Sequence, residues 1–535
     1  MMTLSHTLPA TPNAVLRQAL ELIRAGRFAE ARSLLERLAE RCDERADLLM
    51  AYALAGSHEP VAAANLFCVL ADRHPQAVHP AYELIEMLAA CKRRADAEPV
   101  LREVVRRTPH DGRALEALGE LLIQLGRLDD AAAWLQKAVA LRPDNITARN
   151  LMAACLSEQG RLAEADAIFR AILAEYPNDA RTLANRGALL STENAADLAL
   201  AHYRQAIALN PHDARVRLNH SIALLKDGQY APGWHEHEWR FRLPGRSAPR
   251  AATLMRSLTP DLNLRGKRIL VTHEQGLGDT LMYLRYLPPL ARRGAQLIIS
   301  VPETLAGLVR RIPGVHHVIC NTQPIPPHDW HCPFISLPRV FAATETPMGD
   351  LAPYLTADPN RIRHWRSYLP TNGRLNIGLV WAGAQRPDIA EAQIVDRKRS
   401  VRLDTLAPLG RVPGINLVSL QAGPSAREMT DMPEGMRLYD PMDAVRDMHD
   451  TAALIASLDA VVSVDTAVVH LAGAIGRPVI MMDRYDNCWR WLSKREDSPW
   501  YPTLRIVRQT RPRVWSDVVE RVSAILGDMA TQVAT

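Results

Sequence analysis

Residues 460–478 read AVVSVDTAVVHLAGAIGRP, an apolar run that changes from the pattern of a buried strand to that of a helix. We expect the strand to end at Asp465 and the helix to begin at about Thr466. The free N–H groups and the positive end of such a helix suit a diphosphate. His470 lies one turn into the helix, where it could serve that site or simply fill the core.

Short apolar runs alternate with amphipathic stretches throughout the region after Gly266. The expected strands are Arg268–Thr272, Gln296–Val301, Val318–Cys320, Leu375–Val380, Asn416–Leu420, Ala460–Val464 and Val479–Met482. The expected helices are Thr280–Arg293, Thr304–Arg311, Asp404–Leu409, Thr451–Leu458 and Ala467–Ile475. Such alternation is typical of parallel sheets covered on both faces. Because the stretch 353–374, with its prolines and glycine, separates two series, we expect two small doubly wound α/β subdomains with a cleft between them.

Ligands of such sheets bind beyond the carboxyl ends of the strands, so a second strand-end loop, HEQGLGDT at residues 273–280, is also a candidate site. Gly276 and Gly278 let the backbone approach a ligand closely. The loop is not a Walker loop, because no Gly-Lys-Ser/Thr follows. Asp279 could accept a proton from an attacking hydroxyl, or it could only cap the helix that follows.

The third candidate loop, Trp381–Ala384, follows the expected strand Leu375–Val380. It leads by a long loop to Asp396-Arg397-Lys398-Arg399-Ser400. Cations beside a strand-end loop can neutralise phosphate, which makes Lys398 and Arg399 candidate ligands. The alternative is a solvated run of charge.

The first half of the chain has a period of 34 residues, most visible in five prolines, namely Pro75, Pro109, Pro143, Pro177 and Pro211. Small residues share a second phase, namely Ala63, Ala97, Ala131, Ala165 and Ala199, and large apolar residues a third, namely Phe67, Leu101, Leu135, Phe169 and Tyr203. This is the tetratricopeptide pattern, in which two helices cross closely at a small residue and a proline ends the second. We expect an all-α solenoid, opened by a degenerate unit at residues 12–43. Its concave surface could hold a protein or peptide, or the array could be a plain scaffold.

The solenoid is expected to close with a partial repeat from Ala214 and a capping helix around Trp234–Arg240. His235 and His237 in that helix would point to different sides without a third ligand nearby, so we expect no metal site. Gly, Ser and Pro punctuate the stretch that follows, which is typical of a linker. The predicted divisions are residues 1–245 for the solenoid with its cap, 246–264 for the linker, and 265–355 and 356–535 for the two α/β subdomains.

The composition fits several ordinary globular domains, with 535 residues, 47% hydrophobic and 23% charged. The net charge of +5 is mild and spread over two domains, which argues against a nucleic-acid binder. Seven scattered cysteines, without a Cys-x-x-Cys pair, give no sign of a disulfide framework. We expect no signal peptide and no transmembrane segment, and hence a cytoplasmic location.

The three loops together resemble the ADP-heptose:lipopolysaccharide heptosyltransferase superfamily of the GT-B fold, in the branch where that domain follows tetratricopeptide repeats. Gly278-Asp279 resembles the family's early Gly-Asp, whose aspartate is regarded as the catalytic base. The run Asp465-Thr466-Ala467-Val468-Val469-His470 resembles its Asp-Ser/Thr-Gly-x-x-His signature at the sugar-nucleotide site. The segment 419–423, which contains Gln421, lies where the family has a strand-end loop near the nucleotide. Lys398 and Arg399 lie where a phosphate-binding lysine is expected.

The resemblance covers about residues 265–525, and it has three departures. Ala467 replaces the usual glycine, the loop 384–396 is long, and the half at 266–355 is short. The short half implies an acceptor site different from that for a lipid-A core.

The resemblance implies a metal-independent, inverting glycosyltransferase that uses a nucleotide-diphosphate sugar as donor and no other cofactor. Asp279 would be the base. The donor site, in the last subdomain and the loops facing it, would comprise Gly276, Gly278, Gln421, Lys398, Arg399, Asp465, Thr466, Ala467, Val468 and His470. The repeats would recruit the acceptor, either a glycan or a protein such as flagellin. The alternative is a non-catalytic repeat scaffold whose transferase-like domain only binds or senses a nucleotide sugar.

Overall fold

The computed structural model of the chain describes residues 12–38, 44–57, 59, 62–63, 65–66, 69–70, 94–243, 246, 249–259, 262–344, 347–384 and 390–534. The chain forms two compact units, one of residues 1–175 with 386–394 and the other of residues 176–385 with 395–535. The second unit therefore contains the last helices of the repeat array as well as the α/β half.

The described residues of the first unit form helical hairpins. They are built from α1 (Pro12–Arg24), α2 (Phe28–Glu36), α3 (Glu44–Gly56), η1 (Arg94–Asp96), α6 (Ala97–Arg107), α7 (Gly112–Leu125), α8 (Leu128–Leu141), α9 (Ile146–Glu158) and α10 (Leu162–Glu175). The second unit continues the pattern with α11 (Ala180–Thr192), α12 (Ala196–Leu209), α13 (Ala214–Lys226), α14 (Tyr230–His237) and η2 (Glu238–Arg242). The predicted solenoid of repeats is confirmed, including its opening and closing hairpins.

Local signals recur every 34 residues and fix the ends of the repeat helices. Helix N-caps with side-chain hydrogen bonds to the first turn lie at this spacing, namely Asp111, Asn145, Asp179 and Asp213. The turn inside each hairpin needs a left-handed residue, supplied by Gly126, Gly160 and Gly228 at φ of 80, 84 and 82°. Asn194 takes that place in one repeat at φ 60°, a conformation that Asn tolerates better than most residues.

The predicted close crossing of the two helices is also confirmed. A methyl group at Gly119 would lie 2.5 Å from Leu135, and one at Gly187 would lie 3.1 Å from Tyr203. Each contact joins a glycine of the first helix, rather than one of the alanines of the predicted phase, to the large apolar residue of the second helix. Pro75 and Phe67 lie outside the described residues.

The final repeat shares a hydrophobic core with the α/β half. Trp234, on α14, is 3% exposed, and its ring centroid lies 6.1 Å from that of Tyr283 and 4.9 Å from that of Trp489. On η2, Arg240 donates from Nε and Nη2 to the two carboxylate oxygens of Glu274, at 2.7 and 2.9 Å. The capping helix was predicted to cover the last apolar face of the solenoid, and the core that it completes is that of the second unit.

The stretch predicted as a linker, residues 246–264, packs against the α/β half over its second part. Met255 N donates to the His331 carbonyl at 2.9 Å, and Leu258 N donates to that of Val340 at 2.8 Å. The side chains of Met255, Leu258 and Leu264 are buried. These residues are therefore part of the α/β fold rather than a free tether.

The first α/β subdomain is a four-stranded parallel sheet of order β3-β2-β1-β4. Its strands are β1 (Arg268–Thr272), β2 (Gln296–Val301), β3 (Val315–Cys320) and β4 (Trp330–Pro333). Its helices are α15 (Leu277–Tyr283), η3 (Leu284–Tyr286), α16 (Leu287–Arg292), α17 (Glu303–Val309), η4 (Phe334–Ser336) and α18 (Leu337–Phe341).

The second subdomain is a six-stranded parallel sheet of order β10-β9-β8-β5-β6-β7. Its strands are β5 (Leu375–Val380), β6 (Ile415–Ser419), β7 (Leu438–Tyr439), β8 (Ala460–Val464), β9 (Val479–Asp483) and β10 (Leu504–Arg508). Helical segments around it are α19 (Pro359–Arg366), η5 (Leu403–Arg411), η6 (Pro424–Asp431), η7 (Met442–Ala444), α21 (Met448–Ala456), α22 (Ala467–Ala474), η8 (Trp489–Trp491) and α23 (Ser516–Ala534). The helix α20 (Ala390–Arg399) is divided between the units, with residues 390–394 in the first and 395–399 in the second.

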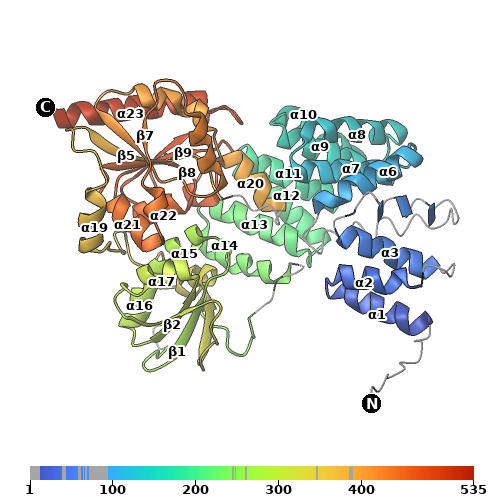
Figure 1. Cartoon of the computed structure of the whole chain (residues 1–535), viewed down its shortest axis with the longest axis horizontal. Helices are drawn as coiled ribbons and strands as arrows, with labels where there is room; N and C mark the ends of the chain where they lie inside the picture. Colours follow the sequence, from blue (N-terminus) through green and yellow to red (C-terminus); the bar gives the residue numbers. More distant parts are fainter. Residues whose placement is uncertain are drawn as a thin grey trace, which may run out of the picture. The chain divides into compact units, whose positions relative to one another are not determined.

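Both faces of the six-stranded sheet are covered, as its apolar strands require. Along β8, Val462 and Val464 point to the core shared with α23, and Val461 points to the opposite core. Figure 1 shows α23 on one side of this sheet and α21 and α22 on the other. The predicted fold class, a helical solenoid followed by two doubly wound subdomains, is confirmed.

Some predicted elements were wrong in detail. The helix expected at Thr280–Arg293 starts earlier, at Leu277, and breaks into α15, η3 and α16, where Pro288 and Pro289 begin a new first turn. The prediction of a long loop at residues 384–396 is also wrong in its second part, because residues 390–399 form α20. Lys398 and Arg399 lie in the last turn of this helix. Among the described residues, no helix is long and apolar enough to cross a membrane.

Candidate active site

The two strand-to-helix turns predicted to carry chemistry meet in the second unit. The turn after β1 starts α15, and the turn after β8 starts α22. A methyl group at Gly278 would lie 2.8 Å from Cδ2 of His470 and 3.4 Å from Cα of Ala467. The structure therefore brings Gly278 and Asp279 to the N-terminus of α22, although nearly 200 residues separate the two turns.

Asp279 is both a helix cap and an ion-pair partner. Its Oδ2 accepts from Gly276 N at 3.1 Å, at the start of α15. Its Oδ1 accepts from Nη2 of Arg490, which comes from η8 after β9 and was not predicted. Burial disfavours the charge on Arg490, but Asp279 and the other nearby groups outweigh it and raise the pKa of Arg490 well above its ordinary value. The guanidinium is therefore a permanent cation beside the candidate base.

His470 is buried, with its ring stacked at 5.3 Å on Trp491 and its Nδ1 2.9 Å from the hydroxyl of Tyr501. Burial, assisted by the charge on Arg490, lowers the pKa of His470 to about 4. The ring is therefore neutral at pH 7, and the Tyr501 hydroxyl can donate to Nδ1. In this arrangement the His470 ring packs in the core beside the turn.

The N-terminus of α22 lacks a side-chain cap. Thr466 is the N-cap residue without a side-chain cap bond, and its hydroxyl lies 3.1 Å from Oγ of Ser463. The first N–H groups of a helix have no acceptor within it, so those of Ala467 and Val468 point out of the turn. Within the described part of the chain, no hydrogen bond or ion pair engages the carboxylate of Asp465, which leaves it available to a hydroxyl.

Lys398 and Arg399 diverge in spite of being neighbours. Arg399 donates from Nη1 to the carbonyl of Asp465 at 2.8 Å and pairs with Asp396 at 2.7 Å. It therefore joins the α22 turn. Lys398 instead pairs with Asp486 at 3.2 Å.

The side-chain amide of Gln421, at the end of β6, makes its hydrogen bonds with backbone groups. Its Oε1 accepts from Trp381 N at 3.1 Å and from Ala382 N at 2.9 Å. Its Nε2 donates to the carbonyls of Ala382 and Ala422 at 3.1 and 2.9 Å. The side chain clamps the loop after β5, so contacts with a ligand fall to its neighbours.

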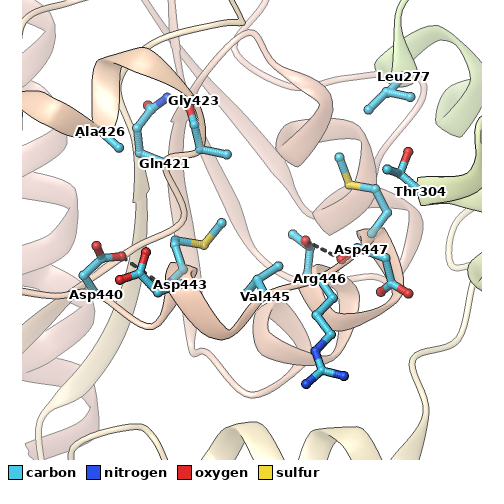
Figure 2. Close-up of a pocket in the computed structure, with 14 residues that line it drawn as sticks. Leu277, Thr304, Gln421, Gly423, Ala426, Asp440, Asp443, Val445, Arg446 and Asp447 are labelled. Atoms are coloured by element: carbon cyan, nitrogen blue, oxygen red, sulfur yellow. Dashed lines mark hydrogen bonds between the residues drawn. The ribbon is translucent and has the colours of Figure 1, made fainter.

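A pocket of about 430 Å³ borders the α15 turn at Leu277 and receives residues from both subdomains. Figure 2 shows Leu277 and Thr304 on one side and Gln421, Gly423 and Ala426 across from them. Carboxylates and one cation complete the lining at Asp440, Asp443, Arg446 and Asp447. In the part of the chain that the structure describes, no cluster of three His, Cys, Asp or Glu could hold a metal ion.

Arg490, Trp491 and Tyr501 were missed by sequence reasoning. The strand before them was predicted, and the rule that ligands bind at strand ends applied equally to the loop CWRW at residues 488–491. The loop was not recognised as a candidate site because it contains aromatic residues where the other two loops contain glycines.

Comparisons with known proteins agree with this architecture. Residues 92–146 and 122–185 match tetratricopeptide-repeat families, and residues 444–513 match glycosyltransferase family 9 (heptosyltransferase). The chain therefore carries tetratricopeptide repeats and a family 9 glycosyltransferase domain, whose matched part includes both the α22 turn and Arg490.

A curated relative, protein FlbA of Caulobacter vibrioides, is 29% identical over 344 residues. The match covers 58% of this chain and 54% of FlbA, so the chain spans about half the length of that relative.

Three solved structures are similar to parts of the chain. A family 9 glycosyl transferase from Veillonella parvula is 11% identical with a TM-score of 0.39, and covers 51% of this chain and 99% of its own. ADP-heptose lps heptosyltransferase II of E. coli is 15% identical with a TM-score of 0.37, and covers 50% of this chain and 100% of its own. MamA of Desulfovibrio magneticus is 18% identical with a TM-score of 0.24, and covers 32% of this chain and 90% of its own.

Proposed function

We propose that this protein is a glycosyltransferase that moves a sugar from a nucleotide-diphosphate donor to an acceptor hydroxyl, with inversion and without a metal ion. One observation carries the proposal: the Gly278-Asp279 turn of one sheet lies against the Ala467–His470 turn of the other. A carboxylate and a helix N-terminus thereby lie close together between two doubly wound subdomains, which supports the proposal.

The donor is placed by the α22 turn and the neighbouring pocket. The free N–H groups of Ala467 and Val468 and the positive helix end bind the diphosphate. The pocket next to Gln421, of about 430 Å³, has room for a nucleoside. Arg399 fixes the turn through the carbonyl of Asp465, and the Asp465 carboxylate accepts from sugar hydroxyls.

In the reaction, the acceptor oxygen attacks the anomeric carbon from the face opposite the diphosphate. A carbon–oxygen bond to the acceptor forms as the carbon–oxygen bond to the diphosphate breaks, and the acceptor proton passes to Asp279. The helix N–H groups stabilise the charge that develops on the leaving diphosphate.

The acceptor is brought by the repeats. Solenoids of this kind expose an extended concave surface suited to a protein chain. A protein acceptor such as flagellin fits this architecture, and the support for it is the repeat family alone.

The second candidate function is a scaffold that senses a nucleotide sugar without turning it over. The ion pair of Asp279 with Arg490 and the alanine at position 467 favour it, since the first occupies the base and the second stiffens the turn.

The test screens the full chain against a panel of nucleotide sugars by thermal shift. A donor present at a hundred times its Kd should stabilise the fold by about 2.7 kcal/mol. Donors that bind are then assayed for release of the nucleoside diphosphate. Binding with release supports the transferase, binding without release supports the sensor, and stabilisation by none of the donors contradicts both.

A further inference from the structure

Arg490 has an unusual set of partners for a buried cation. Its side chain is 16% exposed, and it donates from Nη2 to Asp279 and from Nη1 to the sulfur of Cys488 at 2.9 Å. Its Nε is buried and has no hydrogen-bond partner among the described residues. The guanidinium thus has one strong partner and one weak partner, and its buried Nε–H group has none in the described part of the chain.

Two other arginines near the turn, Arg399 and Arg285, have no bond to the candidate base among their contacts with the described residues. Arg399 is fixed by Asp396 and a carbonyl, and Arg285 donates to the carbonyls of Met282 and Trp500. Arg490 alone among these three pairs with the candidate base. Its loop also packs against α22, because the ring of Trp491, the next residue, stacks on His470.

This pairing obstructs the chemistry proposed for Asp279. One carboxylate oxygen accepts from Gly276 N, and the other accepts from Arg490. An acceptor hydroxyl needs one of these oxygens to receive its proton. The guanidinium is the partner that can leave, because the Gly276 bond is part of the helix end.

A donor offers Arg490 a stronger partner. The diphosphate carries more negative charge than a single carboxylate, and arginine binds phosphate with two parallel hydrogen bonds. The N-terminus of α22, where that diphosphate is placed by the proposed function, belongs to the turn on which the loop of Arg490 packs.

We propose that Arg490 exchanges partners during the reaction: it pairs with Asp279 in the free protein and with the donor diphosphate in the complex. Donor binding thereby frees Asp279 to act as the base, and Asp279 does not accept the acceptor proton until a donor is present. This inference rests on the proposed function and adds a positioning residue to it.

The exchange has a consequence that a fixed ion pair would not have. If Asp279 and the diphosphate compete for Arg490, removing the charge of Asp279 must tighten the binding of a nucleoside diphosphate. A charged hydrogen bond of this kind corresponds to roughly a tenfold change in affinity. Removing Arg490 must weaken binding and also abolish the gain from the Asp279 change.

The experiment is a calorimetric titration of the full chain with ADP, GDP, UDP and CDP. The proteins are the wild type, Asp279→Asn, Arg490→Gln, the double variant and Arg490→Lys, which retains the charge if Arg490→Gln unfolds. Arg495→Gln is the matched control, since Arg495 lies on the same loop but pairs with the exposed Asp497.

We expect about tenfold tighter binding in Asp279→Asn, weaker binding in Arg490→Gln, and no further effect of Asp279→Asn in the double variant. Arg495→Gln should bind as the wild type does. Unchanged or weaker binding in Asp279→Asn overturns the exchange and leaves the donor site standing. If Arg490→Gln unfolds, Asp279→Asn is combined with Arg490→Lys instead. Arg490→Lys retains the positive charge, so Asp279→Asn should still tighten nucleotide binding in this background. Absence of that tighter binding in a folded protein overturns the exchange. Absence of binding by all four nucleotides to the wild type overturns the donor site itself, and the exchange with it.

Discussion

Gly278 and His470 lie so close that a β-carbon on Gly278 would be 2.8 Å from the imidazole Cδ2. The first residue belongs to the helix after the first strand of one sheet, and the second to the helix that follows β8 of the other. This contact brings the turn that carries Asp279 against the α22 turn.

The contact predicts a specific defect in Gly278→Ala. The added methyl group must push the His470 ring or the Ala467 backbone away, which separates the two turns. We expect weaker nucleotide-sugar binding and a loss of stability of about 1–3 kcal/mol, the usual cost of overpacking. Denaturant unfolding and donor titration measure the two effects.

Gly527→Ala is the matched control, because Gly527 lies inside α23 with nothing within 4 Å of an added methyl group. It should stabilise the fold by about 0.5–1 kcal/mol and leave binding unchanged. Normal donor binding in Gly278→Ala would show that the contact does not set the geometry of the site.

Asp279→Asn should keep the fold and reduce turnover by roughly 10²–10⁴-fold, the range expected for a lost general base. Release of nucleoside diphosphate in the presence of acceptor is the measurement. Asp497→Asn, which alters an exposed ion pair, should have normal turnover. Near-normal turnover in Asp279→Asn would reduce Asp279 to a helix cap.

Because His470 is buried and neutral, we expect the free energy of unfolding to fall in acid. The unfolded chain protonates this histidine as the pH falls through about 6.5, whereas the folded chain does so only near a pKa of about 4. Proton uptake by the unfolded state alone lowers the free energy of unfolding across that window, by about 3 kcal/mol at its lower end. Above pH 6.5 this contribution is fully present.

The measurement compares denaturant unfolding of the wild type and His470→Gln between pH 4 and pH 7.5. The variant should be less stable at pH 7.5, because the stacking on Trp491 is lost, and its stability should fall less steeply in acid. Parallel pH dependences in the two proteins would contradict the assignment of the histidine as buried and neutral.

The repeat half and the α/β half should not be separable at the predicted linker. A fragment from Ser257 loses Trp234 and Arg240, which leaves Tyr283 and Trp489 uncovered and Glu274 without its partner. We expect it to be aggregated or poorly folded, and a fragment of residues 176–535 to fold. Circular dichroism and gel filtration distinguish the two.

A point substitution tests the same junction in the full chain, namely the contact of Trp234 and Arg240 with the α/β half, which is called the seam below. Trp234→Ala should lower the stability of the second unit by about 3–5 kcal/mol, the usual cost of removing a buried aromatic side chain. Trp239→Ala, which removes a half-buried ring lying against Arg217 and Arg242, should cost less. Equal effects would mean that the Trp234 cluster does not hold the seam.

Much of the fold was predictable because its signals are local. The proline and alanine periods located the hairpins, and apolar runs located β5 and β8 to the residue. The strand β4 was missed because Trp330–Pro333 contains His and Pro, and β10 because arginines alternate with its apolar residues. These strands are defined by their pairing with β1 and β9, which no local window contains.

The candidate site was predicted in part for the same reason. Gly278-Asp279 and the 465–470 run are compact motifs at strand ends, and the structure brings them together. The partnership of Asp279 with Arg490 spans 211 residues and depends on how the two sheets face each other. The contact of Trp234 with the α/β half was not predicted, because the sequence pattern of an apolar residue on a last helix is the same whether it caps a solenoid or completes another core.

The seam bears on how such a chain can diversify by gene rearrangement. A hairpin that contacts chiefly its neighbours can be duplicated or deleted within the array, so the number of repeats is free to drift between lineages. The last hairpin has no such freedom, since Trp234 and Arg240 are built into the transferase core. Recombination that grafts a new array onto this transferase should therefore leave α13, α14 and η2 in place, and chimeras joined downstream of Arg242 should be selected against.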